Sequence, residues 1–100
     1  MNISKGAATF VSGALLAAGL ATPAMAAITT SYVGGGTWQH GTANGKVVSN
    51  FYHGGRYHKS SVQPSGGSVY SSGCTRPGAW SYASANDTWW VDKAYYAFCD

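Results

Sequence analysis

Leucine is absent from the sequence beyond residue 26, and no apolar pattern recurs there at helical spacing. A helix lying on a membrane needs a continuous apolar face, which this region does not supply. Apart from alanine, its aliphatic residues are all β-branched, and thirteen of its residues are aromatic. Such side chains fit strands better than helices, so the sequence predicts an all-β fold.

Charge is also scarce. Charged residues make up 9% of the sequence, and the net charge at pH 7 is +3, or +2 when only the residues beyond 26 are counted. Generic nucleic-acid binding relies on many phosphate contacts and a dense basic patch. We therefore expect no nucleic-acid partner, no killing by bulk adsorption to anionic lipid and no stable membrane insertion.

Catalytic and metal-binding motifs are missing as well. A glycosidase-type carboxylate pair would depend on Asp87 and Asp92, which lie in or beside one predicted loop. Serines are plentiful, but no nucleophile motif accompanies them. A zinc site of His40, His53 and His58 would have no carboxylate nearby in sequence to orient its ligands. We predict a non-enzymatic protein without metal or cofactor.

The first 26 residues have the organisation of a secretory signal peptide. Lys5 supplies a positive charge, residues 7–21 form an uncharged apolar run, and the small residues from Ala24 to Ala26 resemble a cleavage sequence. The run falls short of the roughly 20 residues that span a bilayer, which disfavours a transmembrane anchor. We predict a signal peptide of residues 1–26 and a secreted, extracellular domain of residues 27–100.

Cys74 and Cys99 are the only cysteines. In an exported chain such a pair normally forms a disulfide, because the compartment is oxidising. Closing a loop of this length would stabilise the fold by on the order of 3.5 kcal/mol. The alternatives are two free buried thiols or a metal site, and the latter lacks further ligands at any standard spacing.

A β-hairpin is predicted over residues 46–62. Two strand-like runs flank Gly54 and Gly55, which can adopt the positive φ angles of a tight turn. In that register Tyr52 lies opposite Tyr57, and both faces carry plausible cross-strand pairs. The expected tip gathers aromatic, imidazole and cationic side chains, an arrangement suited to presenting them to a ligand.

Other strand-like segments lie on both sides of this hairpin. They are residues 37–40, 67–72, 79–85 and 93–99. Turn-like residues separate them, and residues 63–67 form the most open loop. The pattern predicts a small antiparallel β-sandwich or open barrel of about six short strands.

Two short motifs follow one another behind the predicted signal peptide. Residues 36–41 read GTWQHG, and residues 49–54 read SNFYHG, with KSSV at residues 59–62. Together they resemble the lactococcin 972 family of secreted bacteriocins. The specific match covers roughly residues 35–62, and the aromatic C-terminal strand agrees only in character.

The resemblance implies a compact β-sandwich that self-associates and acts on cell-wall synthesis at the septum. It implies the precursor lipid II of target bacteria as partner, and killing without pore formation. The cysteine pair departs from the family's basic form. Because a disulfide can replace stability that self-association supplies, whether the protein forms a homodimer stays open. The alternative function is a wall-associated or carbohydrate-binding structural module that does not kill.

Candidate ligand-binding residues combine cationic donors for phosphate with rings for sugar. They are Trp38, His40, Tyr52, His53, Arg56, Tyr57, His58 and Lys59. For Trp38 core packing is the favoured alternative, and the role of His40 stays undecided. If Trp89 and Trp90 are extended, they point to opposite faces and one of them becomes exposed.

The signal-peptide prediction has a direct mass test. The secreted product should have the mass of residues 27–100 less two hydrogens, because the leader is removed and the two cysteines are oxidised. Intact mass spectrometry of culture supernatant measures this. A secreted form that keeps the leucines of the leader would contradict the prediction.

Overall fold

The computed structural model describes residues 5–11 and 27–100. The regular elements of this part of the chain are strands: β1 (Lys5–Val11), β2 (Ile28–Val33), β3 (Gly36–Ala43), β4 (Lys46–Tyr52), β5 (His58–Gln63), β6 (Tyr70–Ser71), β7 (Trp80–Asn86) and β8 (Val91–Phe98). Over these residues no helix is long and apolar enough to cross a membrane.

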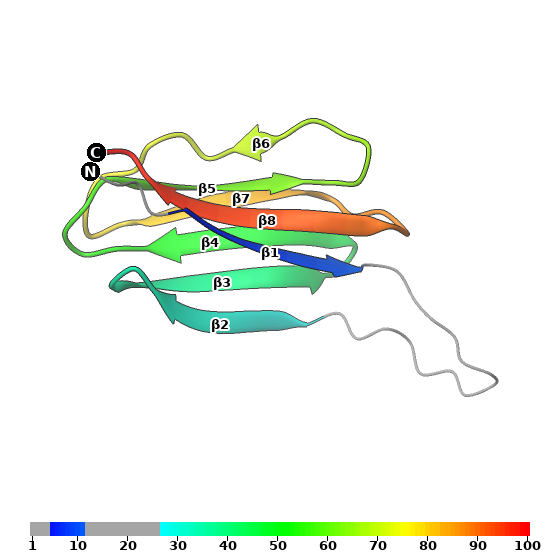
Figure 1. Cartoon of the computed structure of the whole chain (residues 1–100), viewed down its shortest axis with the longest axis horizontal. Helices are drawn as coiled ribbons and strands as arrows, with labels where there is room; N and C mark the ends of the chain where they lie inside the picture. Colours follow the sequence, from blue (N-terminus) through cyan, green and yellow to red (C-terminus); the bar gives the residue numbers. More distant parts are fainter. Residues whose placement is uncertain (1–4, 12–26) are drawn as a thin grey trace.

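The strands form two four-stranded antiparallel sheets that pack against each other (Figure 1). One sheet has the order β1-β8-β5-β6 and the other the order β2-β3-β4-β7. The predicted all-β sandwich is confirmed, and the sheets do not close into a barrel. The structure adds β2, which pairs with β3 and was not expected from the sequence.

The predicted hairpin at Gly54 and Gly55 is wrong. β4 pairs with β3 and β7, whereas β5 pairs with β8 and β6 in the other sheet. Residues 53–57 therefore cross between the sheets, Tyr52 is not paired with Tyr57, and neither glycine has a positive φ. The physical reason is that both edges of β4 already have hydrogen-bonded neighbours, so β5 has to extend the opposite sheet.

The tight turns lie elsewhere. β2 and β3 are joined at Gly34 and Gly35, with φ of 58° and 82°, and β3 and β4 at Asn44 and Gly45, with φ of 52° and 77°. Positive φ at both central residues is what a two-residue hairpin turn of type I′ requires. Asn-Gly is a strong hairpin signal, so this turn could have been predicted from the sequence.

Alternate residues of both sheets point inward and fill the core. The buried apolar residues are Trp38, Val47, Phe51 and Ala83 from one sheet and Val62, Ala94, Tyr96 and Phe98 from the other. The ring of Phe51 lies 4.7 Å from that of Tyr96 and 5.6 Å from that of Phe98, between centroids. These contacts pack β4 against β8 across the sandwich.

Buried hydroxyl groups also link the two sheets. Ser60 on β5 and Ser81 on β7 share a hydrogen bond of 2.7 Å. The indole Nε1 of Trp38 donates to Ser49 Oγ at 2.9 Å, and that hydroxyl donates to the Tyr95 carbonyl at 2.7 Å. Across the described ranges, no buried side-chain nitrogen or oxygen lacks a hydrogen-bond partner.

Strand β1 lies in the segment that the sequence assigns to the signal peptide. It pairs with β8 along the whole length from Lys5 opposite Ala97 to Val11 opposite Val91. Removal of residues 1–26 would take this neighbour away. We therefore expect β8 to be an edge strand in the mature protein, with its outer backbone groups unpaired.

The predicted disulfide is confirmed. Cys74 and Cys99 are bonded, with their Cα atoms 6.1 Å apart. The bridge joins the segment before β7 to the end of β8, close to a backbone pairing in which His58 and Thr75 exchange two hydrogen bonds. It therefore fixes one end of the sandwich.

Reduction of this bridge should lower the thermal unfolding midpoint by roughly 15–25 °C. The expected shift follows from about 3.5 kcal/mol of loop-closure stabilisation in a domain of this size. Circular dichroism melts with and without reductant measure it. The Cys74→Ser/Cys99→Ser variant, as control, should melt like the reduced protein and ignore reductant; equal midpoints for oxidised and reduced protein would show that the bridge contributes little.

Candidate functional site

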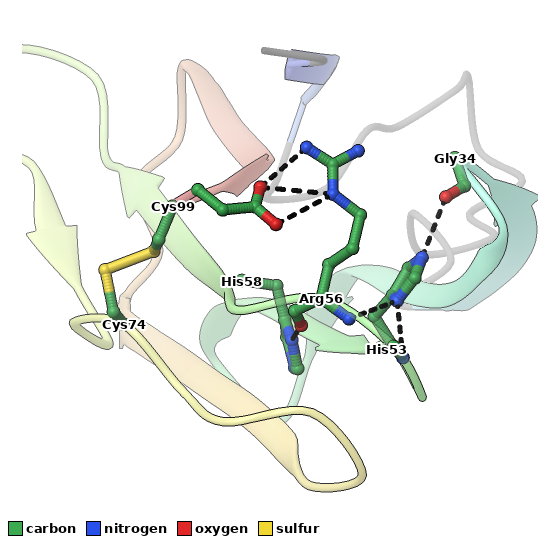
Figure 2. A network of polar contacts seen from close by, with 8 residues as sticks. Gly34, His53, Arg56, His58, Cys74 and Cys99 are labelled. Atoms are coloured by element: carbon green, nitrogen blue, oxygen red, sulfur yellow. Dashed lines mark hydrogen bonds and ion pairs between the residues drawn. A yellow bond between two sulfur atoms is a disulfide. The ribbon is translucent and has the colours of Figure 1, made fainter. Parts of the chain in front are cut away.

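His53 shapes the crossover between β4 and β5. Its Nδ1 accepts hydrogen bonds from the backbone N–H groups of Gly55 and Arg56, both at 3.0 Å. Its Nε2 donates to the Gly34 carbonyl at 3.1 Å (Figure 2). The ring thus turns the crossover and ties it to the β2–β3 turn, so both ring nitrogens are used within the fold.

Arg56 points toward the C-terminus. Its Nη2 donates to Asp100 Oδ1 at 2.6 Å and its Nε donates to both carboxylate oxygens (Figure 2). Its guanidinium carbon lies 3.7 Å from the centroid of the Phe98 ring. The hydrogen bond lowers the pKa of Asp100 and raises that of Arg56. An anionic ligand at Arg56 would have to compete with this carboxylate.

His58 is fully buried. Its Nδ1 lies 2.7 Å from the Arg56 carbonyl oxygen and its Nε2 lies 2.8 Å from the Ala79 carbonyl oxygen. The ring also meets that of Phe51 edge-on, at 5.5 Å between centroids. His58 therefore joins the crossover to the segment before β7 and offers no surface to a ligand.

Trp38 and His40 face the interior from β3. Trp38 is 4% exposed, and the His40 ring stacks on it with centroids 3.8 Å apart. His40 Nε2 also shares a hydrogen bond of 3.0 Å with Ser31 Oγ, and burial lowers the pKa of the imidazole. Both side chains pack in the sandwich, in agreement with the core alternative for Trp38.

The other three predicted residues lie on different surfaces. Tyr52 packs beside Trp80 on the outer face of the second sheet, with centroids 5.6 Å apart. Tyr57 is exposed in the crossover, and Lys59 lies on the outer side of β5, since its neighbours His58 and Ser60 point inward. The structure therefore does not bring the eight predicted residues into one site.

A groove lies on the outer face of the first sheet. Its volume is about 400 Å³, and its lining includes Lys59 and Ser61 from β5, Ser71 from β6, Tyr95 from β8, and Val69. The pairing of β5 with both β8 and β6 brings these residues together, since Ser61 is opposite Tyr95 on one side and Ser71 on the other. A cation, hydroxyl groups and a phenol ring thus share one concave surface.

Only Lys59 of this groove was among the predicted site residues. The alternation of inward and outward residues along β5 would have placed Ser61 on the face of Lys59. Tyr95 could not be placed in the groove from the sequence, because the predicted hairpin paired β5 with β4 and not with β8. The groove depends on the long-range pairing of β5 with β8.

The histidines do not gather around a common point. His53 and His58 have ring centroids 6.4 Å apart, and each is hydrogen-bonded to backbone groups. Where the structure describes the chain, no group of three or more histidine, cysteine or acidic residues could hold a metal ion.

The comparison with known families bears on this surface. A family model described as a bacteriocin of the lactococcin 972 type matches residues 34–96. The chain belongs to the lactococcin 972 family. The matched region runs from the β2–β3 turn into β8. It therefore includes most of the residues that line the groove. No curated protein and no solved structure matches the chain.

In this member of the lactococcin 972 family, we expect His58 to stabilise the fold. His58→Ala should lower the free energy of unfolding by about 3 kcal/mol, because it leaves a cavity and removes the ring nitrogens that lie against the Arg56 and Ala79 carbonyls. Urea unfolding measures the change. Tyr57→Ala, which removes the exposed neighbouring ring, should change stability by about 0.5 kcal/mol or less; similar losses for both variants would refute a structural role specific to His58.

Proposed function

We propose that the protein is a secreted bacteriocin that binds the cell-wall precursor lipid II and blocks wall synthesis at the septum without forming pores. Membership of the lactococcin 972 family supports a secreted antibacterial function, and the small all-β fold is consistent with binding rather than catalysis. The observation that carries the proposed recognition is the groove beside Lys59.

The groove has the chemistry that a cell-wall precursor requires. Lipid II presents a pyrophosphate, amino sugars and a short peptide at the outer face of the membrane. The ammonium group of Lys59 can donate charge-assisted hydrogen bonds to its anionic groups. The Tyr95 ring offers an apolar surface for a sugar, and the hydroxyls of Ser61 and Ser71 can donate or accept hydrogen bonds.

Lys59 is a better candidate cation than Arg56. Arg56 forms an ion pair with Asp100. Lys59 takes no part in it and lines the groove. Since a paired guanidinium must first release its carboxylate, the proposed recognition centres on Lys59, and Arg56 holds the C-terminus in place.

A second candidate function is a carbohydrate-binding structural module that does not kill. It is favoured by three aromatic rings on the outer face of the second sheet, in which Trp80 lies 5.6 Å from Tyr52 and 6.4 Å from Tyr82. Asn50 is paired with Tyr82 in the register, so an amide accompanies the rings. This module would bind wall glycan and leave growing cells unharmed.

Lys59→Ala should weaken killing of sensitive Gram-positive bacteria by about tenfold or more, as expected for loss of a charge-assisted hydrogen bond. Dilution assays on indicator cultures measure the potency. Arg76→Ala is the matched control, because Arg76 is also an exposed cation but does not line the groove. Its potency should be unchanged.

Added purified lipid II should protect the cells from the wild-type protein. Equal potency of the Lys59→Ala and wild-type proteins would remove the groove from the mechanism. Killing that lipid II fails to antagonise, or rapid loss of membrane potential, would overturn precursor binding without pores. A protein that kills no strain would favour the structural module.

A further inference from the structure

The turn between β7 and β8 exposes two neighbouring tryptophans. Trp89 and Trp90 are each 72% exposed, and Val91, which follows them, is 40% exposed. From the sequence, one of these two indoles was expected to be exposed if the pair is extended, and the structure exposes both. Figure 1 shows the turn at one end of the long axis, far from the C-terminus. We name residues 89–91 the tryptophan tip.

A buried carboxylate holds the tryptophan tip in shape. Asp92 is fully buried and accepts hydrogen bonds from Thr88 Oγ1 at 2.7 Å, from the Thr88 N–H and, at 3.0 Å, from the Ser65 N–H of the β5–β6 loop. Thr88 Oγ1 in turn accepts from the Trp90 N–H at 3.1 Å. The adjoining Asp87 N–H donates to the Gly45 carbonyl. These bonds fix the backbone of the turn on both sides, and both indoles lie exposed on it.

Two large apolar side chains exposed side by side often mark a surface that binds a protein or a membrane. Indole combines a large apolar surface with one N–H donor, and tryptophan concentrates where hydrocarbon meets water at membrane surfaces. The charges around the tip suit an anionic surface. Lys46, which pairs with Asn86 at the end of β7, and Lys93 on the outer side of β8 are both exposed, whereas the carboxylate of Asp87 is half-buried and that of Asp92 is buried.

A second copy of the chain fits the tip less well. Two tryptophans bury at most about 500 Å². A stable protein interface needs about 800 Å² from each partner. A bilayer surface needs no complementary protein contour, so two exposed indoles on a fixed turn are sufficient for reversible docking.

We propose that the tryptophan tip docks the protein on an anionic phospholipid bilayer, with Trp89 and Trp90 seated among the headgroups and no strand crossing the membrane. This docking goes beyond recognition of the precursor, because it needs only lipid. Lys46 and Lys93 add attraction to lipid phosphates. The tip thereby concentrates the protein at the membrane surface.

The test uses the secreted protein and vesicles of equal parts phosphatidylglycerol and phosphatidylcholine, without lipid II. Co-sedimentation should show binding by the wild-type protein that weakens about tenfold or more in Trp89→Ala/Trp90→Ala. Tyr82→Ala is the matched control, because it removes an exposed ring from the outer face of β7 and should bind like the wild type. Circular dichroism should show the same fold in all three proteins.

Brominated acyl chains supply a second readout. They should quench part of the wild-type tryptophan fluorescence and leave the double variant, which keeps Trp38 and Trp80, unquenched. Equal vesicle binding by the wild-type and double-variant proteins, equal loss in Tyr82→Ala, or no binding at all would overturn the proposal. Self-association that only the double variant loses, measured by sedimentation velocity, would assign the tip to a second copy. None of these outcomes bears on lipid II binding, since the vesicles contain none.

Discussion

The packing of Phe51 against the inner face of β8 holds the two sheets together. Its ring is fully enclosed by Tyr96 and Phe98 across the sandwich and by His58 at the side. The core has few aliphatic side chains besides Val47 and Val62. Stability therefore depends on aromatic contacts, whose geometry is specific, and a small shift of one sheet would disturb several of them at once.

Small hydroxyl residues complete this arrangement. Ser60 and Ser81 face each other between β5 and β7, and their short side chains let these strands lie close together. Their hydroxyl groups are hydrogen-bonded to each other, so neither is left unpaired in the core. Ser81 Oγ also donates to the Phe51 carbonyl at 3.1 Å. Hydrogen bonds across the core thus take the place of apolar volume that the chain does not have. They act directionally, so they select one relative placement of the sheets.

The crossing from β4 to β5 explains why the sequence suggested a ligand site at residues 52–59. The residues that a ligand could use, imidazole rings and a guanidinium, are also those that a tight crossover needs. An imidazole can accept at one nitrogen and donate at the other, as His53 does. Arg56 covers the Phe98 ring and neutralises Asp100. Residue type alone could not distinguish these structural roles from binding.

The parts of the fold that depend on local patterns could be predicted, and those that depend on strand pairing could not. The strand-like segments that became β7 and β8, the oxidisable cysteines and the β-branched composition led to the prediction of an all-β fold with one disulfide. The partner of β5 was missed because Gly54 and Gly55 fit a hairpin, although Asn44 and Gly45 fit one better. Without the pairing of β5 and β8, the groove could not be assembled from sequence.

Strand β8 connects the two proposed contact surfaces. Val91 belongs to the tryptophan tip, Lys93 follows about 7 Å further along the outer face and Tyr95 about 13 Å along, from the rise of an extended strand. The headgroup layer on each side of a bilayer is about 5–8 Å thick. A protein docked by the tip with β8 along the bilayer normal would hold Lys93 at the level of the phosphates and the groove just above them. The sugars and peptide of a membrane-anchored precursor project into that same layer of water, so docking on lipid and recognition in the groove are geometrically compatible along one strand.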